Sequence, residues 1–375
     1  MRIGVLLPRE ETFSAYYGGA VARWVSEVYR RLDSPIDVTV FGAPVTPEDI
    51  YQLPYCANSS SRVCGAISRI PYVRRYGDRV WLKSWRAQLR SCDLLHIHCR
   101  PQWVPLLRAA GFRGSLVLHL HNNSLGHCDG PGLDRIAMDV QAVVVCSRWL
   151  QDTFVQKSPA IAAKTQVVYN GVDTELFYPS ESIREPKTVF IVGRFDPEKG
   201  MLQLVRAYDR VLESHPDAKL VIGGTTGFGT HNETNYVREV RRTANAICER
   251  HDATVQFLGY IHHDRDLPSW FQRATLFACP SIFQEPFGLV NAEAMACATP
   301  IVGSDRGGIP EVVADGGVFV NPDDIEALAQ AISMLFSHPD HRRSLGRSGY
   351  ERCKRLFDWD AIAGKWQSLL ETLSS

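Results

Sequence analysis

The sequence predicts an α/β protein with two Rossmann-like domains. Its 375 residues exceed what one compact core usually holds, which indicates about two domains. Short apolar runs alternate with helical stretches along most of the chain, which is the pattern of parallel sheets covered by helices. A polar, proline-bearing stretch at residues 173–187 separates two such series. We therefore expect one domain on each side of this linker.

The first series covers residues 1–172. Its expected strands are residues 2–7, 36–41, 94–98, 116–120, 142–146 and 166–169. Gly18 and Gly19 precede a helical stretch, and two glycines before a helix commonly form a loop. His119 and His121 lie at the end of the fourth strand. Because side chains alternate along a strand, both histidines are expected on one face of the sheet.

The second series covers residues 188–357. Its expected strands are residues 188–193, 219–223, 254–257, 275–279, 300–303 and 317–320. A helix is expected to run to about residue 215, because apolar side chains recur at helical spacing. This face consists of Leu204, Tyr208, Val211 and Leu212. Further helices are expected at residues 289–297 and 358–375.

Two carboxylates, Glu285 and Glu293, flank the start of an expected helix. Glu285 lies in the preceding loop, and Glu293 lies about a turn and a half into the helix. At the helix N-terminus, the free amides of Phe287, Gly288 and Leu289 can donate hydrogen bonds to a ligand. Carboxylates and free amides in this arrangement suit the hydroxyl groups of a sugar.

Two cations, Arg194 and Lys199, surround another strand-to-helix turn. Arg194 follows the carboxyl end of the strand at residues 188–193, and Lys199 opens the next helix. Two cations and a helix N-terminus can converge on one anion. An Arg and a Lys at this spacing are also common in solvated loops, so the interpretation depends on the glutamate segment. Together the two segments suggest a diphosphate site.

These segments resemble the retaining glycosyltransferases of the GT-B fold, family 4, whose hallmark is two glutamates separated by seven residues in this setting. The resemblance implies two Rossmann-like domains that face each other across a cleft. It implies that Glu285 holds hydroxyls of the donor sugar and that Glu293 holds the ribose hydroxyls of the nucleotide. Arg194 and Lys199 would hold the donor diphosphate and stabilise it as it leaves.

The resemblance also gives roles to motifs of the first domain. Gly18 and Gly19 would form the turn that faces the diphosphate. Members of the family place a histidine close to the donor sugar, usually followed by Asp or Asn. His121, which Asn122 follows, fits this position better than His119, although the choice between the two histidines stays open.

The two domains take different roles in the family. The resemblance implies that residues 1–172 bind the acceptor and that residues 188–357 bind the nucleotide sugar. Residues 169–179, YNGVDTELFYP, resemble the interdomain junction, and the final helix at residues 358–375 is expected to pack on the first domain. The implied reaction is transfer of a hexosyl unit from a nucleotide-diphosphate sugar with retention of anomeric configuration. The resemblance implies no metal or other cofactor.

The donor and acceptor are less sharply indicated than the reaction. Residues 95–103, LHIHCRPQW, are similar to bacterial members that build lipopolysaccharide core, surface polysaccharide or spore-coat glycans. This favours a UDP-sugar and a glycan or glycolipid acceptor, with a GDP-mannose-dependent mannosyltransferase as the alternative. The same residues would also suit a catalytically silent homologue that serves as a binding subunit, or a glycoside hydrolase that uses both glutamates.

Charge is balanced over the whole chain but not within residues 62–90. The formal net charge is zero, so no overall field favours nucleic acid. Residues 62–90 hold eight basic residues and a single acid. They suggest peripheral contact with an anionic membrane, where each cation contributes about 1 kcal/mol. The alternative is an ordinary helix whose residues Trp81, Trp85 and Leu89 share a buried face.

Cysteine usage indicates the compartment. Ten cysteines without a CxxC pair or a signal peptide suggest reduced thiols in the cytoplasm, which includes the inner face of the cytoplasmic membrane. Cys92, His96, His98 and Cys99 suggest zinc at first sight. Strand alternation, however, turns Cys99 away from the two histidines. We therefore expect no metal site.

Overall fold

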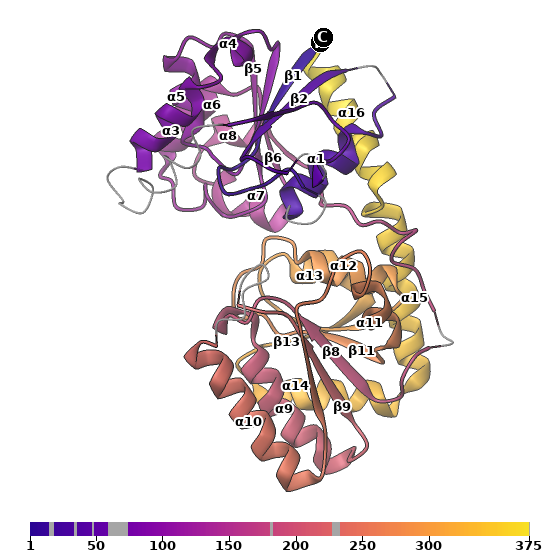
Figure 1. Ribbon diagram of the computed structural model, residues 1–375. Helices are drawn as coiled ribbons and strands as arrows, with labels where there is room; N and C mark the ends of the chain where they lie inside the picture. Colours follow the sequence, from indigo (N-terminus) through magenta and orange to yellow (C-terminus); the bar gives the residue numbers. More distant parts are fainter. Residues whose placement is uncertain are drawn as a thin grey trace. The chain divides into compact units, whose positions relative to one another are not determined.

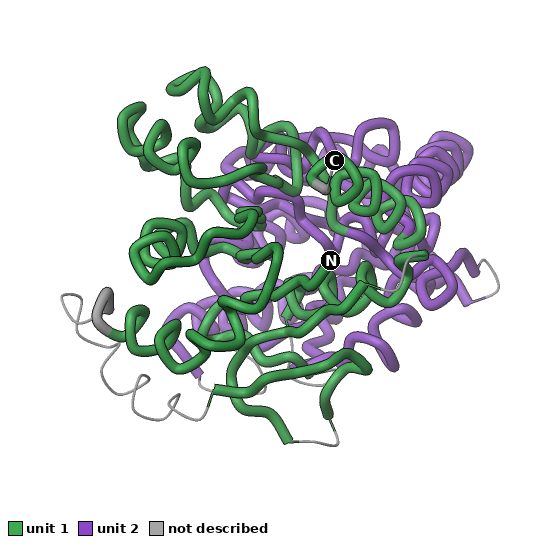
Figure 2. Tube along the Cα trace, turned by 90° about the horizontal axis from the view of Figure 1, so that it is seen from above, with its two compact units in different colours: residues 1–170, 359–375 green, residues 171–358 purple. Residues whose placement is uncertain are grey.

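The computed structural model describes residues 1–14, 19–33, 36–46, 49–58, 74–180, 183–226 and 233–374. The chain forms two compact units, coloured separately in Figure 2. Unit 1 comprises residues 1–170 and 359–375, and unit 2 comprises residues 171–358. Each unit is a parallel sheet covered by helices (Figure 1), which confirms the predicted pair of Rossmann-like domains. Residues 173–187, the expected linker, belong to unit 2.

The sheet of unit 1 has seven described strands in the order β3-β2-β1-β4-β5-β6-β7, and all neighbouring pairs are parallel. The strands are β1 (Arg2–Leu6), β2 (Asp37–Gly42), β3 (Tyr55–Ala57), β4 (Leu94–His98), β5 (Ser115–Leu120), β6 (Ala142–Val145) and β7 (Thr165–Val167). Six of them lie within two residues of the predicted positions. The sequence did not indicate β3, which has only three residues.

Helices cover both faces of this sheet. They are α1 (Ala20–Tyr29), α3 (Arg74–Lys83), α4 (Arg86–Arg90), α5 (Trp103–Ala109), α6 (Gly130–Asp139), α7 (Arg148–Val155), α8 (Pro159–Ala162) and α16 (Trp359–Ser374). In Figure 1, α1 and α16 lie side by side on one face, and α5 and α6 cover the other. The final helix thus completes the first unit, after the chain has passed through the second.

The sheet of unit 2 has the order β10-β9-β8-β11-β12-β13. Its strands are β8 (Thr188–Val192), β9 (Lys219–Gly223), β10 (Val255–Gly259), β11 (Leu276–Cys279), β12 (Ile301–Ser304) and β13 (Gly317–Val320). Its helices are η3 (Pro197–Lys199), α9 (Met201–Ser214), α10 (Asn235–His251), α11 (Leu267–Arg273), α12 (Leu289–Ala296), α13 (Ile309–Val313), η4 (Ala314–Gly316), α14 (Ile325–Ser337) and α15 (Pro339–Leu356).

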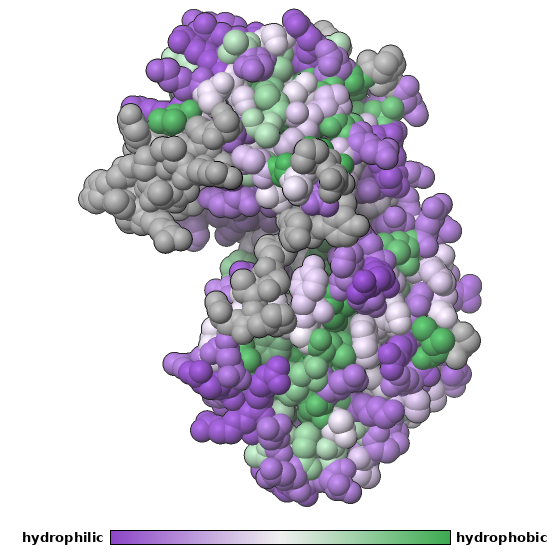
Figure 3. Space-filling model, in the orientation of Figure 1, coloured by the Kyte–Doolittle hydropathy of each residue, from purple (hydrophilic) through white to green (hydrophobic). Residues whose placement is uncertain are grey.

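The core of unit 2 lies between this sheet and α9, α10 and α14. The predicted apolar face of α9 is confirmed, because Leu204, Tyr208, Val211 and Leu212 are all buried. Only four residues of α10 are buried, and its outer surface is hydrophilic at the lower left of Figure 3. The helix therefore covers the core with one narrow stripe. The carboxyl ends of the parallel strands all meet at one edge of the sheet, which is where ligands of such folds bind.

Candidate active site

The motif residues of unit 2 gather at the carboxyl edge of its sheet. Arg194 follows β8, Lys199 lies in the turn η3, and Glu285 follows β11. Because β8 and β11 are parallel neighbours, the loops after them lie next to each other. Lys199 and Glu285 are in direct contact. Arg194 is exposed and makes no ion pair with any residue that the structure describes.

Lys199 and Glu285 form an ion pair. The Lys199 side chain is 28% exposed and that of Glu285 is 12% exposed, so both keep access to a ligand. The hydroxyl of Ser281 also donates to Oε1 of Glu285 at 3.2 Å. A cation and a hydrogen-bond acceptor are thereby held side by side. This combination suits a ligand that carries both an anionic group and hydroxyl groups.

Gly200 allows this close approach. Its φ angle is +71°, a backbone conformation that side chains other than glycine's rarely adopt. A Cβ atom at this position would lie 1.9 Å from the carbonyl oxygen of Pro280, at the end of β11. The turn that carries Lys199 therefore fits against the segment that leads to Glu285 only because residue 200 has no side chain.

The N-terminus of α12 is open. Gly288 precedes the helix with a φ angle of +77°, and no side chain caps it. Within the described ranges, the amides of Gly288 and Leu289 have no protein acceptor. Phe287 is buried and packs edge-on against Phe357 at a ring-centroid distance of 5.4 Å, which anchors the loop before the helix. Two amides thus remain available to an anion or a hydroxyl oxygen.

A second loop supports the backbone of Glu285. The amide of Gly308 donates to the carbonyl oxygen of Glu285 at 2.7 Å, and the amide of Gly307 donates to Oε1 of Gln284 at 2.7 Å. A Cβ atom on Gly307 would lie 2.4 Å from that same carbonyl oxygen. The backbone at Glu285 is therefore held against the loop that contains Gly307 and Gly308.

Glu293 is buried within α12. Its Oε1 lies 2.7 Å from Nε2 of His263, whose Nδ1 lies 2.6 Å from Oδ1 of Asp264. The ring of Phe177 packs edge-on against His263. Oε2 of Glu293 is buried and has no hydrogen-bond partner among the described residues. An unused oxygen of a buried carboxylate is a strong acceptor for a ligand hydroxyl.

A pocket of about 150 Å³ opens at the same edge of the sheet. Its lining comes from the ends of β8, β9 and β10, namely Val192, Gly193, Arg194, Gly224, Thr225, Tyr260 and Ile261. Gly224 has a φ angle of +122°, and a Cβ there would lie 1.7 Å from the carbonyl oxygen of Gly193. The exposed ring of Tyr260 offers a flat apolar surface beside these glycines. The pocket adjoins the cation Arg194.

In unit 1, His121 lies just past the end of β5 and belongs to a cluster of four histidines. His96 and His98 come from β4, and His119 comes from β5. Of the two histidines considered from the sequence, His119 is fully buried, whereas His121 is half-buried at the strand end. Trp24 of α1 packs against all four rings.

The histidines form two separate hydrogen-bonded chains. In the first, Oη of Tyr29 lies 3.0 Å from Nδ1 of His96, whose Nε2 lies 3.2 Å from Nδ1 of His119. In the second, Oδ1 of Asn170 lies 2.8 Å from Nδ1 of His121, whose Nε2 lies 3.2 Å from Nδ1 of His98. The chains end at Nε2 of His119 and of His98, which are buried without a hydrogen-bond partner in the described part of the chain.

Burial keeps these histidines neutral. It lowers the pKa of His121 to about 4, although the hydrogen bond to Asn170 acts in the opposite direction. Burial likewise lowers the pKa values of His96, His98 and His119 well below their ordinary value of 6.5. At neutral pH the whole cluster is therefore uncharged.

Three of these residues could in principle hold a metal ion. One nitrogen each from His96, His98 and His119 lies within 4.8 Å of the others. Both ring nitrogens of His96 are engaged, one by Tyr29 and one by His119, so a zinc ion would have to displace one of these two hydrogen bonds. Cys92 and Cys99, which the sequence suggested as ligands, are not part of this group of described residues. Sγ of Cys99 instead accepts the backbone N–H of His121 at 3.4 Å.

The N-terminus of α1 already has an acidic partner. Gly19 precedes the helix, and Oε1 of Glu11 accepts the amide of Ala22 at 3.1 Å. Burial raises the pKa of Glu11, while its hydrogen bonds to backbone amides act in the opposite direction. Gly18, the other glycine of the predicted turn, lies outside the described residues. An anionic ligand at Gly19 would have to share the helix end with Glu11.

Two family models match the sequence and overlap in the middle of the chain. Residues 17–176 match the model described as Glycosyltransferase Family 4, and residues 173–352 match the model described as Glycosyl transferases group 1. The matches span residues 17–352 without a gap. The chain belongs to the family 4 glycosyltransferases.

Curated relatives agree with this assignment. The glycosyltransferase is 28% identical to spore coat protein SA of Bacillus subtilis over 99% of each chain. It is 35% identical to alpha-maltose-1-phosphate synthase of Mycolicibacterium smegmatis over 65% of this chain and 66% of the relative.

Solved structures are similar in fold. Sucrose-phosphate synthase from Thermosynechococcus elongatus has a TM-score of 0.75 at 24% identity and covers 99% of this chain and 98% of its own. HepE of Anabaena in complex with UDP has a TM-score of 0.77 at 22% identity, over 99% of this chain and 100% of its own. The glycosyltransferase therefore has the GT-B fold that the resemblance implied.

Several residues at the candidate site of the glycosyltransferase were missed in the sequence. The glycine after β9, Gly224, carries a usable signal, because two adjacent glycines end that strand. His263 and Tyr260 carry none, since they reach the site only through the fold. Asn170 lies in the segment that resembles the interdomain junction, yet its side chain contacts His121. Asp173 of the same segment accepts the amides of its own turn.

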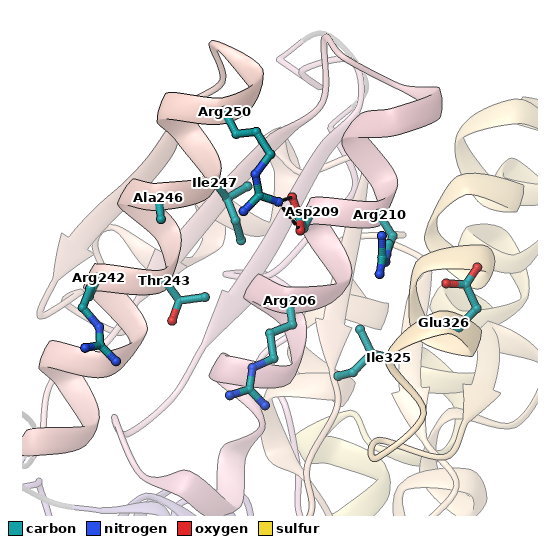
Figure 4. Close-up of a pocket in the computed structure, with 10 residues that line it drawn as sticks. All are labelled: Arg206, Asp209, Arg210, Arg242, Thr243, Ala246, Ile247, Arg250, Ile325 and Glu326. Atoms are coloured by element: carbon teal, nitrogen blue, oxygen red, sulfur yellow. Dashed lines mark hydrogen bonds and ion pairs between the residues drawn. The ribbon is translucent and has the colours of Figure 1, made fainter.

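A pocket of about 710 Å³ lies away from the motifs of the glycosyltransferase, between α9, α10 and α14 (Figure 4). Four arginines line it, and three of them pair with acids. Arg250 contacts Asp209, as the dashed lines in Figure 4 show, while Arg210 and Arg206 pair with the neighbouring acids Glu213 and Glu239. The positive charge of this pocket is thus largely compensated by acids, and none of the motif residues lines the pocket.

Proposed function

We propose that this glycosyltransferase moves a hexosyl unit from a nucleotide-diphosphate sugar to a glycan or glycolipid acceptor, with retention of anomeric configuration. The proposal is carried by the pairing of Lys199 with Glu285 beside the open amides of Gly288 and Leu289. A diphosphate would bond Lys199 and the helix amides, and the sugar hydroxyls would bond Glu285.

Cations beside the diphosphate would lower the barrier to transfer. As the bond between the anomeric carbon and the diphosphate breaks, positive charge develops on the sugar and negative charge on the leaving group. Lys199, together with the exposed Arg194, would stabilise that negative charge. In our hypothesis the acceptor hydroxyl attacks the same face, and its proton passes to the leaving diphosphate. NMR of the product's anomeric configuration tests retention, and a covalent glycosyl adduct on Glu285 would contradict the same-face route.

A UDP-sugar is the favoured donor. The pocket beside Tyr260 and Gly224 offers room for a base, and Oε2 of Glu293 offers an acceptor for ribose hydroxyls. Solved structures of the similar protein HepE in complex with UDP and with UDP-glucose support this choice. GDP-mannose remains the alternative donor, and a catalytically silent binding subunit the alternative function.

A thermal-shift panel followed by turnover assays tests the donor. A nucleotide at 100 times its dissociation constant stabilises the folded state by about 2.7 kcal/mol. We expect UDP and a UDP-sugar to raise the melting temperature, and Lys199→Ala and Glu293→Ala to abolish this effect. Lys187→Ala is the matched control, because Lys187 lies at the opposite end of β8 and pairs with Asp217. Stabilisation by GDP alone would select the alternative donor, and binding without any sugar release would favour the silent homologue.

The acceptor is proposed to be a lipopolysaccharide or surface polysaccharide precursor. The similarity to a spore coat protein of Bacillus subtilis supports a surface glycan in general. Incubation of the enzyme with a radiolabelled sugar donor and a bacterial membrane extract tests this directly. Label in the glycolipid fraction would support the proposal, and label only in small water-soluble sugars would overturn it.

Peripheral contact with an anionic membrane at the cytoplasmic face is part of the same proposal. Arg79, Lys83, Arg86 and Arg90 line a groove of about 350 Å³ with an apolar floor that includes Phe112. Trp81 and Trp85 are buried in unit 1, so the contact would depend on the cations. Residues 62–73 lie outside the described residues. Within the described ranges, no helix is both long and apolar enough to cross a bilayer.

Vesicle co-sedimentation tests the membrane contact. We expect binding to phosphatidylglycerol vesicles but not to phosphatidylcholine vesicles, with loss of binding at high salt. Lys83→Glu with Arg86→Glu should abolish it. Arg343→Glu with Arg347→Glu, which reverses two exposed cations of α15, is the control. Equal binding by both double variants would refute a role for the groove.

A further inference from the structure

We infer that Asn170 and His98 are positioning residues that hold His121 as a neutral imidazole with its proton on Nδ1. This inference rests on the proposed function only in placing His121 near the reacting sugar. Its consequence is that His121 does not take the proton of the acceptor hydroxyl.

The hydrogen bonds determine which nitrogen carries the proton. Oδ1 of Asn170 can only accept, so Nδ1 of His121, at 2.8 Å, must donate. A neutral imidazole has one N–H, so Nε2 of His121 is left with a lone pair. That lone pair faces Nδ1 of His98 at 3.2 Å, which must therefore donate in turn. His98 therefore donates to His121, and His121 donates to Asn170.

Both ring nitrogens of His121 are consequently engaged by the protein. A general base needs a free lone pair within reach of the proton that it removes. The lone pair of His121 is held by His98, and its N–H is held by Asn170. Nε2 of His98 has no hydrogen-bond partner in the described part of the chain, so a proton that reached His98 would find no onward acceptor there.

The surroundings of the ring also oppose protonation. His98 and His96 of β4 and His119 of β5 supply imidazoles, Trp24 of α1 supplies an indole, and Cys99 supplies a thiol that accepts the backbone N–H of His121. None of these groups is a carboxylate that could stabilise an imidazolium. Burial among them lowers the pKa of His121 to about 4, so the neutral form persists at physiological pH.

In the proposed transfer, a group other than His121 must therefore accept the proton of the acceptor hydroxyl. The new bond joins the acceptor oxygen to the anomeric carbon, and the bond from that carbon to the diphosphate oxygen breaks. The hydroxyl proton leaves on the diphosphate. In this scheme His121 contributes a fixed, neutral group beside the sugar, and Asn170 and His98 act through it.

Side-chain ¹⁵N NMR of histidine-labelled protein tests the tautomer without any substrate. We expect His121 to show a protonated Nδ1 and an unprotonated Nε2 from pH 8 down to about pH 5. Asn170→Asp should raise the pKa of His121, because a carboxylate stabilises the imidazolium. Asn122→Asp is the matched control, since it adds the same charge at the exposed residue that follows His121, where the side chain accepts from the hydroxyl of Ser124. A proton on Nε2 in the wild type would overturn the inference.

Kinetics test the positioning role. Asparagine at position 98 can present an N–H where Nδ1 of histidine lies, whereas leucine cannot. We expect His98→Asn to be about tenfold more active than His98→Leu, the factor that a loss of about 1.4 kcal/mol in hydrogen bonding produces. In the Asn170→Asp variant we expect the reaction rate to fall at acidic pH, a decrease that the wild type lacks. Equal activity of the two His98 variants would overturn the positioning role. Failure to turn over any donor sugar would refute the proposed function, while the NMR result would still decide the tautomer.

Discussion

Nε2 of His263 lies 2.7 Å from Oε1 of Glu293, and Oε2 of the same buried carboxylate lacks a hydrogen-bond partner among the described residues. We expect Glu293→Gln to weaken UDP binding about tenfold. A hydrogen bond to a charged carboxylate is roughly 1.5 kcal/mol stronger than a hydrogen bond to the neutral amide that replaces it. His263→Ala should leave the carboxylate without its partner and lower the free energy of unfolding by about 1–3 kcal/mol. Calorimetric titration and urea unfolding measure the two effects. Normal stability of His263→Ala would contradict this account of the pair.

Lys199→Ala should reduce kcat more than it reduces stability. Loss of one preorganised charge beside a leaving group typically costs about 10²–10³ in rate. The ion pair with Glu285 is partly exposed, so its contribution to folding is expected to be about 1 kcal/mol or less. Steady-state kinetics and thermal unfolding separate the two quantities. A large fall in melting temperature with little change in kcat would show that the pair is structural.

Gly200→Ala should disrupt the site through the backbone. The added Cβ would lie 1.9 Å from the carbonyl oxygen of Pro280, and the φ angle of +71° is unfavourable for alanine. Gly364→Ala is the matched control, because it lies in α16 with no atom within 4 Å of the new Cβ. The control should stabilise the helix by about 0.5–1 kcal/mol. Thermal unfolding measures the change in stability of both variants. Equal changes for Gly200→Ala and Gly364→Ala would contradict the prediction.

Unit 1 should lose stability as the pH falls below 6.5. Burial lowers the pKa of His121 to about 4 and lowers those of His96, His98 and His119 well below the ordinary value of 6.5. Below pH 6.5 the unfolded chain therefore binds more protons than the folded chain, so the free energy of unfolding falls as the pH drops towards 4. Each extra proton contributes about 1.4 kcal/mol per pH unit. Above pH 7 this contribution is fully present.

Urea unfolding at pH 7.5 and pH 5.0 measures this dependence. His119→Leu should reduce the difference between the two pH values, because one buried imidazole is removed. His338→Gln, which changes an exposed histidine, should leave the difference unchanged. A wild-type stability that is the same at both pH values would show that the histidines are not buried as neutral groups.

The fold could be predicted because its signals are local. Apolar runs located every described strand of both sheets except β3, an edge strand in which none of the three residues is buried. Trp81, Trp85 and Leu89 are all buried, as the helix alternative predicted, but they do not share one helix, because α3 ends at Lys83 and α4 begins at Arg86. Periodicity could not indicate whether these residues meet a membrane or the core of unit 1. In the structure the two tryptophans lie in the core of unit 1, where their ring centroids are 5.2 Å apart.

Some residues of the candidate site could be picked out from the sequence, but the contacts between them could not. Lys199 and Glu285 each stood out beside a helix start, but their direct pairing depends on β8 and β11 being neighbours. His98 and His119 are likewise opposite one another only because of the register between β4 and β5. Nothing in a single sequence encodes strand order or register directly. A residue that one motif marks could therefore be named from the sequence, whereas a contact between two distant residues could not.

The position of α16 bears on how the protein folds during synthesis. Unit 2 is one continuous stretch of chain, whereas unit 1 needs residues 359–374, including the fully buried Trp366, to cover α1 and the histidine cluster. On the ribosome the second unit can therefore reach its native state before the first is complete. Helix α1 is made before unit 2 and α16 is made after it, so the apolar surface of α1 stays uncovered and open to chaperones in the interval.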